Sequence, residues 1–154
     1  MLKGIWFPKQ GVTDSGLKYR VALGLDWITD LGGEDRLTGP GSDQLGPFAG
    51  VAMSFENGLT VIPLAQHFFD ISGEDVNISA LRLIALQSFR ENWWLKLDAI
   101  VPYNWENETV PAEAEIQLGH NFSPRFAMYV DGLAGIGNDR AFDWGVGLGV
   151  RFNY

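Results

Sequence analysis

The sequence predicts an all-β protein, an antiparallel up-and-down transmembrane β-barrel with about eight strands in this chain, either complete or the C-terminal part of a larger barrel. Three observations predict this fold. Long segments alternate apolar with polar residues, the connections between them alternate in length, and no segment approaches the ~18 apolar residues of a membrane-spanning helix. We expect an N-terminal loop or remnant segment at 1–16, followed by the barrel domain at 17–154.

The clearest alternation covers residues 141–154. From Phe142 to Tyr154 every even-numbered residue is large and apolar, whereas the odd-numbered ones are small or polar, with glycine at 145, 147 and 149. A period of two predicts a long strand with one apolar and one polar face. Because the polar face is rich in glycine and the chain ends on an aromatic residue, the segment is similar to the closing strand of a bacterial outer-membrane barrel. We expect its apolar face to contact lipid.

The earlier segments follow the same pattern. Residues 1–16 show no sustained period, 17–27 alternate cleanly, and 29–45 are rich in Gly, Asp, Glu and Pro, which predicts a long loop. The other predicted strands are 47–55, 59–70, 76–89, 93–103, 110–122 and 125–134.

One predicted strand, 76–89, has blurred faces. Arg82 and Gln87 fall on opposite parities of the alternation. This predicts a β-bulge within the segment, or else a register that differs from the one assigned by parity.

The connections between the predicted strands alternate long and short. Short turns are expected at 56–58, 90–92 and 123–124, and longer polar loops at 29–45, 71–75, 105–109 and 135–140. Outer-membrane barrels have this asymmetry, with short periplasmic turns and longer extracellular loops. An even strand count would then place both chain ends on the periplasmic side. Pairing of 17–27 with 141–154 would close the sheet and bring Arg151 near Lys18 and Arg20.

Composition excludes several kinds of partner and cofactor. The net charge of −8 argues against nucleic acid, which requires clustered Lys and Arg. The absence of cysteine excludes disulfides and thiolate metal sites. His67 and His120 are the only histidines, and neither belongs to a cluster with metal-ligand spacing, so we expect no metal and no cofactor. The first ten residues lack the apolar core of a secretory signal, so a mature form or a fragment is expected.

The order of the motifs resembles a known family. The sequence runs through F-E-N-G-L-T-V, S-G-E-D-V-N-I-S-A-L-R-L, E-N-W-W-L-K-L-D-A-I-V-P-Y-N-W-E and V-P-A-E-A-E-I-Q-L-G-H to the terminal strand. Over residues 44–154 this is similar to the C-terminal part of the transporter-like outer-membrane β-barrel proteins associated with the meta-pathway of phenol degradation. The resemblance implies a porin-like channel or uptake protein in the bacterial outer membrane, for small solutes that include aromatic or hydrophobic compounds. It brings no catalytic motif.

Candidate functional residues follow from the strand faces. If the apolar faces meet lipid, the opposite faces line the barrel lumen. The expected lumen-lining residues are Lys18, Arg20, Asp26, Lys96, Asp98, Glu113, Glu115, Gln117, Asp143 and Arg151, with Gln66, Arg82, Tyr129 and Asp131 as weaker candidates. Adjacent strands should bring Lys96 and Asp98 close to Glu113 and Glu115. Two interpretations stay open: a packed polar plug, or a solute path that requires extra strands or a partner chain.

Aromatic residues near the predicted strand ends are expected to anchor the barrel at the membrane interfaces. These residues are Trp27, Trp93, Tyr103, Trp144 and Tyr154, with Trp105 as a further candidate. The expected partners are therefore outer-membrane lipid and a small-molecule solute, with the oligomeric state left open.

Two other function classes are compatible with the sequence. One is a soluble lipocalin-like barrel that binds a ligand, which would turn the apolar faces inward. The other is an envelope enzyme, which would need His67 or His120 beside a serine and an acid. None of the serines sits in a nucleophile motif, so we expect no enzyme.

Overall fold

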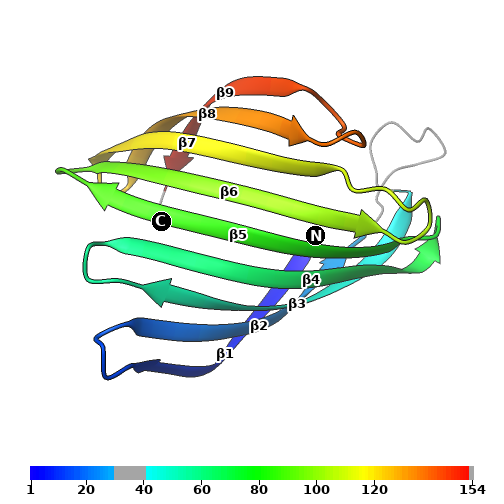
Figure 1. Ribbon diagram of the computed structural model, residues 1–154, viewed down its shortest axis with the longest axis horizontal. Helices are drawn as coiled ribbons and strands as arrows, with labels where there is room; N and C mark the ends of the chain where they lie inside the picture. Colours follow the sequence, from blue (N-terminus) through cyan, green and yellow to red (C-terminus); the bar gives the residue numbers. More distant parts are fainter. Residues whose placement is uncertain (30–40, 153–154) are drawn as a thin grey trace.

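The computed structural model describes residues 1–29 and 41–152. In these residues nine strands form one antiparallel sheet, in which each strand pairs with the next along the chain (Figure 1). The strands are β1 Leu2–Val12, β2 Lys18–Ile28, β3 Ser42–Ser54, β4 Leu59–Gly73, β5 Asn77–Phe89, β6 Trp93–Asn104, β7 Ala112–Ser123, β8 Phe126–Ile136 and β9 Trp144–Phe152. A helix long and apolar enough to cross a membrane is not found in the described part of the chain.

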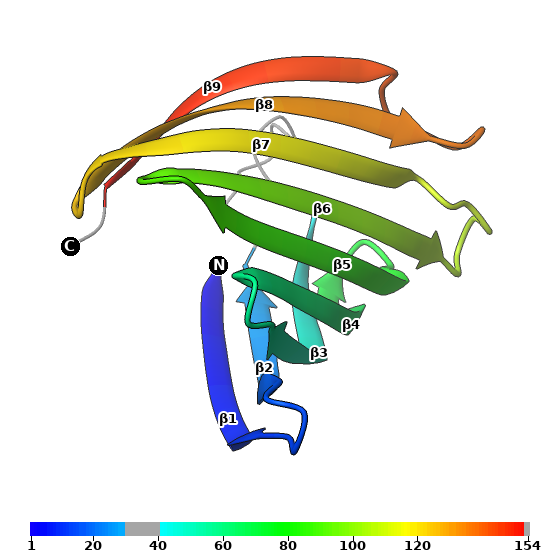
Figure 2. The same cartoon turned by 60° about the vertical axis from the view of Figure 1, so that its left-hand side comes forward.

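The sheet is curved and open (Figure 2). Among the described residues, β1 pairs only with β2 and β9 pairs only with β8, so these two strands are the edges of the sheet. The predicted closure between 17–27 and 141–154 is therefore wrong. The physical reason is that β1 occupies the edge of β2 that a closing strand would need. Arg151 is consequently not paired beside Lys18 and Arg20.

The N-terminal segment differs from the prediction. Residues 1–16 were expected as a loop or remnant, yet Leu2–Val12 form β1. The register against β2 shifts between Trp6 and Lys9, around Pro8. Because of this shift, the odd-numbered residues of β1 lie on one face of the sheet before it and on the opposite face after it. The apolar–polar alternation by which a strand is recognised in the sequence is therefore interrupted. An added strand also makes the count odd, which places Leu2 and Phe152 at opposite ends of the sheet rather than at one end.

The remaining predicted strands are confirmed, with different ends. Strand β3 starts at Ser42 and β4 continues to Gly73, inside segments that were predicted as loops. Most of the predicted loop 29–45 lies outside the described residues. The predicted bulge in 76–89 is wrong, because β5 keeps a continuous register with both neighbours. Gln87 lies near the end of β5 and donates from Nε2 to the Asn57 carbonyl oxygen of the adjacent turn at 3.1 Å.

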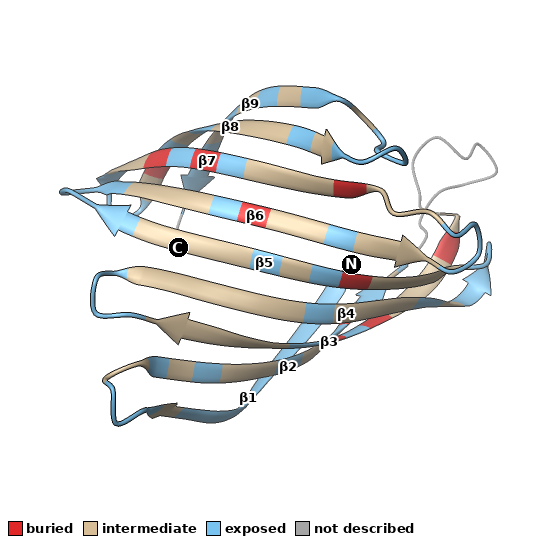
Figure 3. Ribbon diagram, viewed as in Figure 1, coloured by how far each residue is buried: buried red, intermediate tan, exposed pale blue. Residues whose placement is uncertain are grey.

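The two faces of the sheet differ in polarity and exposure. One, here the apolar face, exposes large side chains such as Leu81 at 67% and Leu148 at 84%. The other, here the polar face, shelters Asp98 and Gln117 at 6% each. Figure 3 shows how little of the described chain is buried. Its buried apolar residues are Phe48, Ala80, Ala112 and Ala127. The more sheltered side of this curved sheet is thus the one that carries the charges.

Candidate functional site: the polar face and its ion pairs

A network of charged side chains occupies the middle of the polar face, on β5, β6 and β7. Arg82 donates from Nε and Nη2 to Asp98 Oδ1 and Oδ2, both at 2.7 Å. Lys96 Nζ lies 2.8 Å from Asp98 Oδ2 and 2.9 Å from Glu115 Oε2. Gln117 then donates to Glu115 Oε1 at 2.7 Å. The network thus combines two cations, two carboxylates and an amide across three strands.

The strand register explains why these groups meet. Asp98 lies directly opposite Glu115, and Lys96 directly opposite Gln117, in the β6–β7 ladder. Two carboxylates facing one another would repel, and Lys96 bridges both of them. The Asp98 side chain is 5% exposed and that of Lys96 19%. The Arg82 side chain is 40% exposed, and its two-pronged contact with the sheltered Asp98 carboxylate is charge-assisted. The network is therefore internally neutral and geometrically well defined.

A second polar contact links the first four strands. Asp26 is 4% exposed, and its Oδ2 lies 3.1 Å from Lys3 Nζ. Gln66 Nε2 donates to the same oxygen at 2.9 Å, reaching across Gly46, whose carbonyl oxygen it also contacts at 3.3 Å. Asp26 therefore ties β1 to β4 across the polar face. Lys3 was missed in the sequence because its strand was not predicted.

Aromatic rings cover the glycines of this face. Trp94 packs against Gly119, and Tyr129 packs against Gly149, where a Cβ atom would collide with the ring. The Arg151 guanidinium lies over both rings, at 5.1 Å from the centre of Trp94 and 6.0 Å from that of Tyr129. Glycine at alternate positions in β9 thus makes room for side chains of β8. Trp94 shares the parity of Lys96, which was the available sequence signal for its place on this face.

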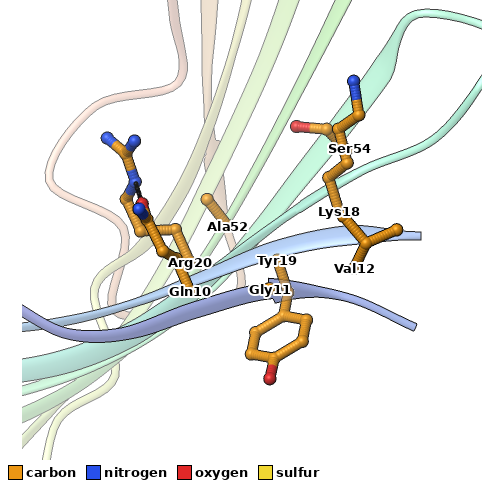
Figure 4. A pocket seen from close by; sticks show the side chains of 8 residues that line it. All are labelled: Gln10, Gly11, Val12, Lys18, Tyr19, Arg20, Ala52 and Ser54. Carbon is orange, nitrogen blue, oxygen red and sulfur yellow. Dashed lines mark hydrogen bonds between the residues drawn. The ribbon is translucent and has the colours of Figure 1, made fainter. Parts of the chain in front are cut away.

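A shallow basic hollow lies at the turn end of β1, β2 and β3. It has a volume of about 480 Å³ and includes Gln10, Lys18, Arg20 and Ser54 in its lining. Arg20 Nε donates to Gln10 Oε1 at 3.2 Å, and its guanidinium lies 5.0 Å from the Phe7 ring centre. In Figure 4, Arg20 and Gln10 project to one side of the strands and Tyr19 to the other. The hollow therefore adds positive charge to the turn end of the polar face.

The predicted lumen-lining residues share the polar face, with one exception. The network brings Lys96, Asp98, Glu115 and Gln117 together and adds the weaker candidate Arg82. Asp143 does not lie on this face of β9, which starts at Trp144. Its carboxylate instead pairs with Arg140 at 2.7 Å in the preceding loop, where the Asp143 side chain is 75% exposed.

The predicted anchors Trp27, Trp93, Tyr103 and Trp144 all lie on the apolar face near strand ends; Tyr154 is outside the described residues. Around Trp93 a chain of ring contacts crosses β6 to β9 at the turn end. This turn-end belt consists of Trp93, His120, Phe122, Phe126 and Phe152, with neighbouring ring centres 4.7 to 5.7 Å apart.

A second group of rings lies at the loop end of the apolar face. Tyr103 stacks edge-on against Trp105 at 4.7 Å, and His67 lies 6.2 Å from Phe69. These four residues form the loop-end belt. Aromatic residues are thus gathered at both ends of the apolar face, with aliphatic residues between them.

The envelope-enzyme interpretation required a histidine, a serine and an acid together. His67 Nδ1 does lie 3.0 Å from Ser79 Oγ. The described contacts of His67 are with Ser79 and Phe69, so the acid is missing from this group. His120 packs between Trp93 and Phe122 instead. The described residues also contain no group of three or more His, Asp or Glu side chains arranged to hold a metal ion.

Comparison with protein-family models, with curated proteins and with solved structures finds no match for this chain. The family resemblance inferred from the motif order therefore stays a prediction.

Proposed function

We propose that this chain forms the wall of a bacterial outer-membrane β-barrel that acts as a porin-like channel or uptake protein for small compounds. The observation that carries the proposal is that the sheet exposes its apolar face and shelters its polar face. From β4 to β9 the apolar face carries no Asp, Glu, Lys or Arg within the described strands, and most of its leucines are exposed, namely Leu81, Leu83, Leu97, Leu118 and Leu148. Water is a poor environment for so large an uncharged surface, whereas lipid is a good one.

The spacing of the belts supports the same environment. Trp93 and Tyr103 lie ten residues apart on β6, one in each belt. At about 3.3 Å per residue they are separated by about 33 Å along the strand. A strand tilted by about 40° converts this distance to about 25 Å along the membrane normal, which equals the height of the apolar band of outer-membrane barrels.

The polar face then corresponds to the lumen side. Its central charges neutralise one another, and the exposed cations Lys18 and Arg20 lie toward the turn end. Such a surface suits a water-filled path for small solutes. The alternative is a structural barrel whose lumen is plugged by the same ion pairs, and only transport distinguishes the two.

The proposal also requires that the sheet edges are covered. Unpaired backbone groups are very costly in hydrocarbon, so β1 and β9 must be hydrogen-bonded to further strands in the membrane. The soluble ligand-binding alternative is not favoured by the observed faces. It needs the apolar side chains turned inward, whereas here they are the exposed ones.

Reconstitution tests the proposal. The purified chain should need detergent to stay monodisperse, and it should insert into phospholipid vesicles. In a planar bilayer we expect discrete conductance steps, and vesicles should swell in small neutral solutes. A monodisperse monomer without detergent contradicts the membrane proposal. Insertion with a flat current trace and no swelling contradicts the channel and favours the plugged barrel.

A further inference from the structure

A groove crosses the apolar face over β3 to β6. Two adjoining hollows of about 640 and 780 Å³ share Ala49, Ala65, Leu81 and Val101 in their lining. The alanines leave a depression beside the exposed leucine, because their side chains are short. The two hollows together form an open and largely apolar groove. These properties fit an acyl chain.

The loop end of this groove is polar. His67, Ser79 and Tyr103 belong to its lining, and Trp105 reaches Ser79 from the following loop. Ser79 Oγ lies 3.0 Å from both the Trp105 Nε1 and the His67 Nδ1 atoms. These side chains form the His67 cluster, which interrupts an otherwise apolar surface.

The indole of Trp105 fixes one hydrogen-bond direction in the cluster. An indole N–H only donates, so Ser79 Oγ accepts from Trp105. Ser79 Oγ keeps a second lone pair and its own hydrogen, so it pairs with either tautomer of His67 at Nδ1. In the tautomer whose Nδ1 accepts from Ser79, the neutral imidazole carries its proton on Nε2. This tautomer has an Nε2–H donor for an oxygen acceptor at the head of an apolar groove, and it is the one that the proposed site uses.

We propose that this groove binds a membrane lipid whose head group carries phosphate, with an acyl chain against Ala49, Ala65 and Leu81 and a phosphate oxygen at His67 Nε2. This site rests on the proposed function, because it assigns lipid to the apolar face. The position of the head group agrees with the rings of Tyr103 and Trp105, since such rings lie at head-group level in membranes.

A second groove on the apolar face serves as a control for the proposed lipid site. It has a volume of about 610 Å³, crosses β7 to β9 and is lined on this face by Ile116, Leu118, Val130, Val146 and Leu148. The lining on this face has no hydrogen-bonding side chain. The other histidine of the face, His120, packs between rings in the turn-end belt. The groove over β3 to β6 therefore has hydrogen-bonding side chains at its loop end, whereas the lining of the groove over β7 to β9 on this face is aliphatic.

Native mass spectrometry of the delipidated chain in detergent tests the site. The probes are phosphatidic acid and diacylglycerol with identical acyl chains, which differ only in the phosphate. The native chain should hold phosphatidic acid about tenfold more tightly, the effect of one hydrogen bond to a charged group. His67→Phe should abolish this preference, and Leu81→Trp should weaken both lipids by filling the groove. His120→Phe and Leu148→Trp should leave the preference unchanged, with equal β-sheet circular dichroism in every variant.

Other outcomes overturn the inference. Equal binding of the two lipids, or an unchanged preference in His67→Phe, removes the site. Covalent labelling of Ser79 by a fluorophosphonate also overturns it, because the cluster would then be a nucleophile–base pair rather than a receptor. A chain that inserts into vesicles without this preference loses the site and keeps the proposed function. A chain that stays out of vesicles yet prefers phosphatidic acid through His67 loses the proposed function and keeps the site.

Discussion

At the scale of single residues, Asp98 holds the polar face together. Its carboxylate is almost fully sheltered and accepts from Arg82 on β5 and from Lys96 on its own strand. Removing one partner of such a group leaves opposite charges without compensation in a poorly hydrated place. Exposed pairs such as Arg140 with Asp143 lack this dependence, because water screens them.

The substitution Asp98→Asn should therefore destabilise the fold by about 3 kcal/mol, since Arg82 and Lys96 lose their shared carboxylate. Asp143→Asn should cost about 0.5 kcal/mol or less, because its pair is exposed. Urea unfolding in vesicles, followed by tryptophan fluorescence, measures both. Equal losses in the two variants would show that the buried network does not contribute more than a surface pair.

Glycine positions on the polar face give a second residue-level prediction. A Cβ atom at Gly119 would collide with the Trp94 indole, whereas at Gly145 its nearest contact is a Leu133 methyl group at 4.0 Å. Gly119→Ala should cost about 1 to 3 kcal/mol through overpacking, and Gly145→Ala should change stability little. The same unfolding measurement compares them, and a neutral Gly119→Ala would contradict the packing of Trp94.

At the scale of the element, β6 shows within one strand the same division into an apolar and a polar face as the whole sheet. Its odd positions run from Trp93 through Leu97 to Tyr103 on the apolar face, and its even positions include Lys96 and Asp98 on the polar face. A strand of this kind is stable only where one face meets an apolar medium and the other meets polar groups. The position of a residue along the strand then determines how much a charged substitution on the apolar face destabilises the fold.

A charge placed on the apolar face tests this. Leu97 lies mid-strand and is 46% exposed, while Ile136 ends β8 at the loop side and is 50% exposed. In a bilayer Leu97→Arg should cost about 2 to 4 kcal/mol, and Ile136→Arg no more than about 1 kcal/mol. Unfolding in vesicles measures the difference. Equal and small costs would indicate that both positions face water, and would contradict the proposed membrane environment.

At the scale of the whole molecule, the main feature is that the sheet has two edge strands, β1 and β9. Every inner strand pairs on both sides, whereas β1 and β9 each pair on one side. Exposed edge strands invite pairing with other strands, and β9 carries large apolar residues along its length. Within residues 1–29 and 41–152 the curvature of the sheet brings no pairing between β1 and β9.

Hydrogen exchange reports whether the edges are covered. In vesicles we expect the amides of β1 and β9 to be protected about as well as those of β5, because unpaired groups are excluded from hydrocarbon. In detergent without a bilayer the same edge amides should exchange at least about tenfold faster than those of β5. Fast exchange of β1 and β9 within the bilayer would contradict the requirement that both edges are paired.

Much of the local arrangement follows from the sequence. Alternation located β2 to β9, because side chains of a strand point to opposite faces in turn. Consecutive strands of an up-and-down sheet lie side by side, so the meeting of Lys96 with Glu115 was predicted from the faces of 93–103 and 110–122, and it is confirmed at 2.9 Å. The contact of Arg82 with Asp98 was harder to predict, since a misjudged bulge left the face of Arg82 open.

What the sequence determined by itself is the chemistry of the two faces in the strands with clean alternation, because a period of two assigns their side chains to a face without knowledge of neighbouring strands. Only the tertiary structure decided the strand at residues 2–12, the open sheet and the odd count, since a register shift hides β1 and edge pairing depends on distant segments. It also decided that Ser79 and His67 share a groove, which requires two strands to be aligned in space. Faces are local properties of a strand, whereas edges and grooves belong to the assembled sheet.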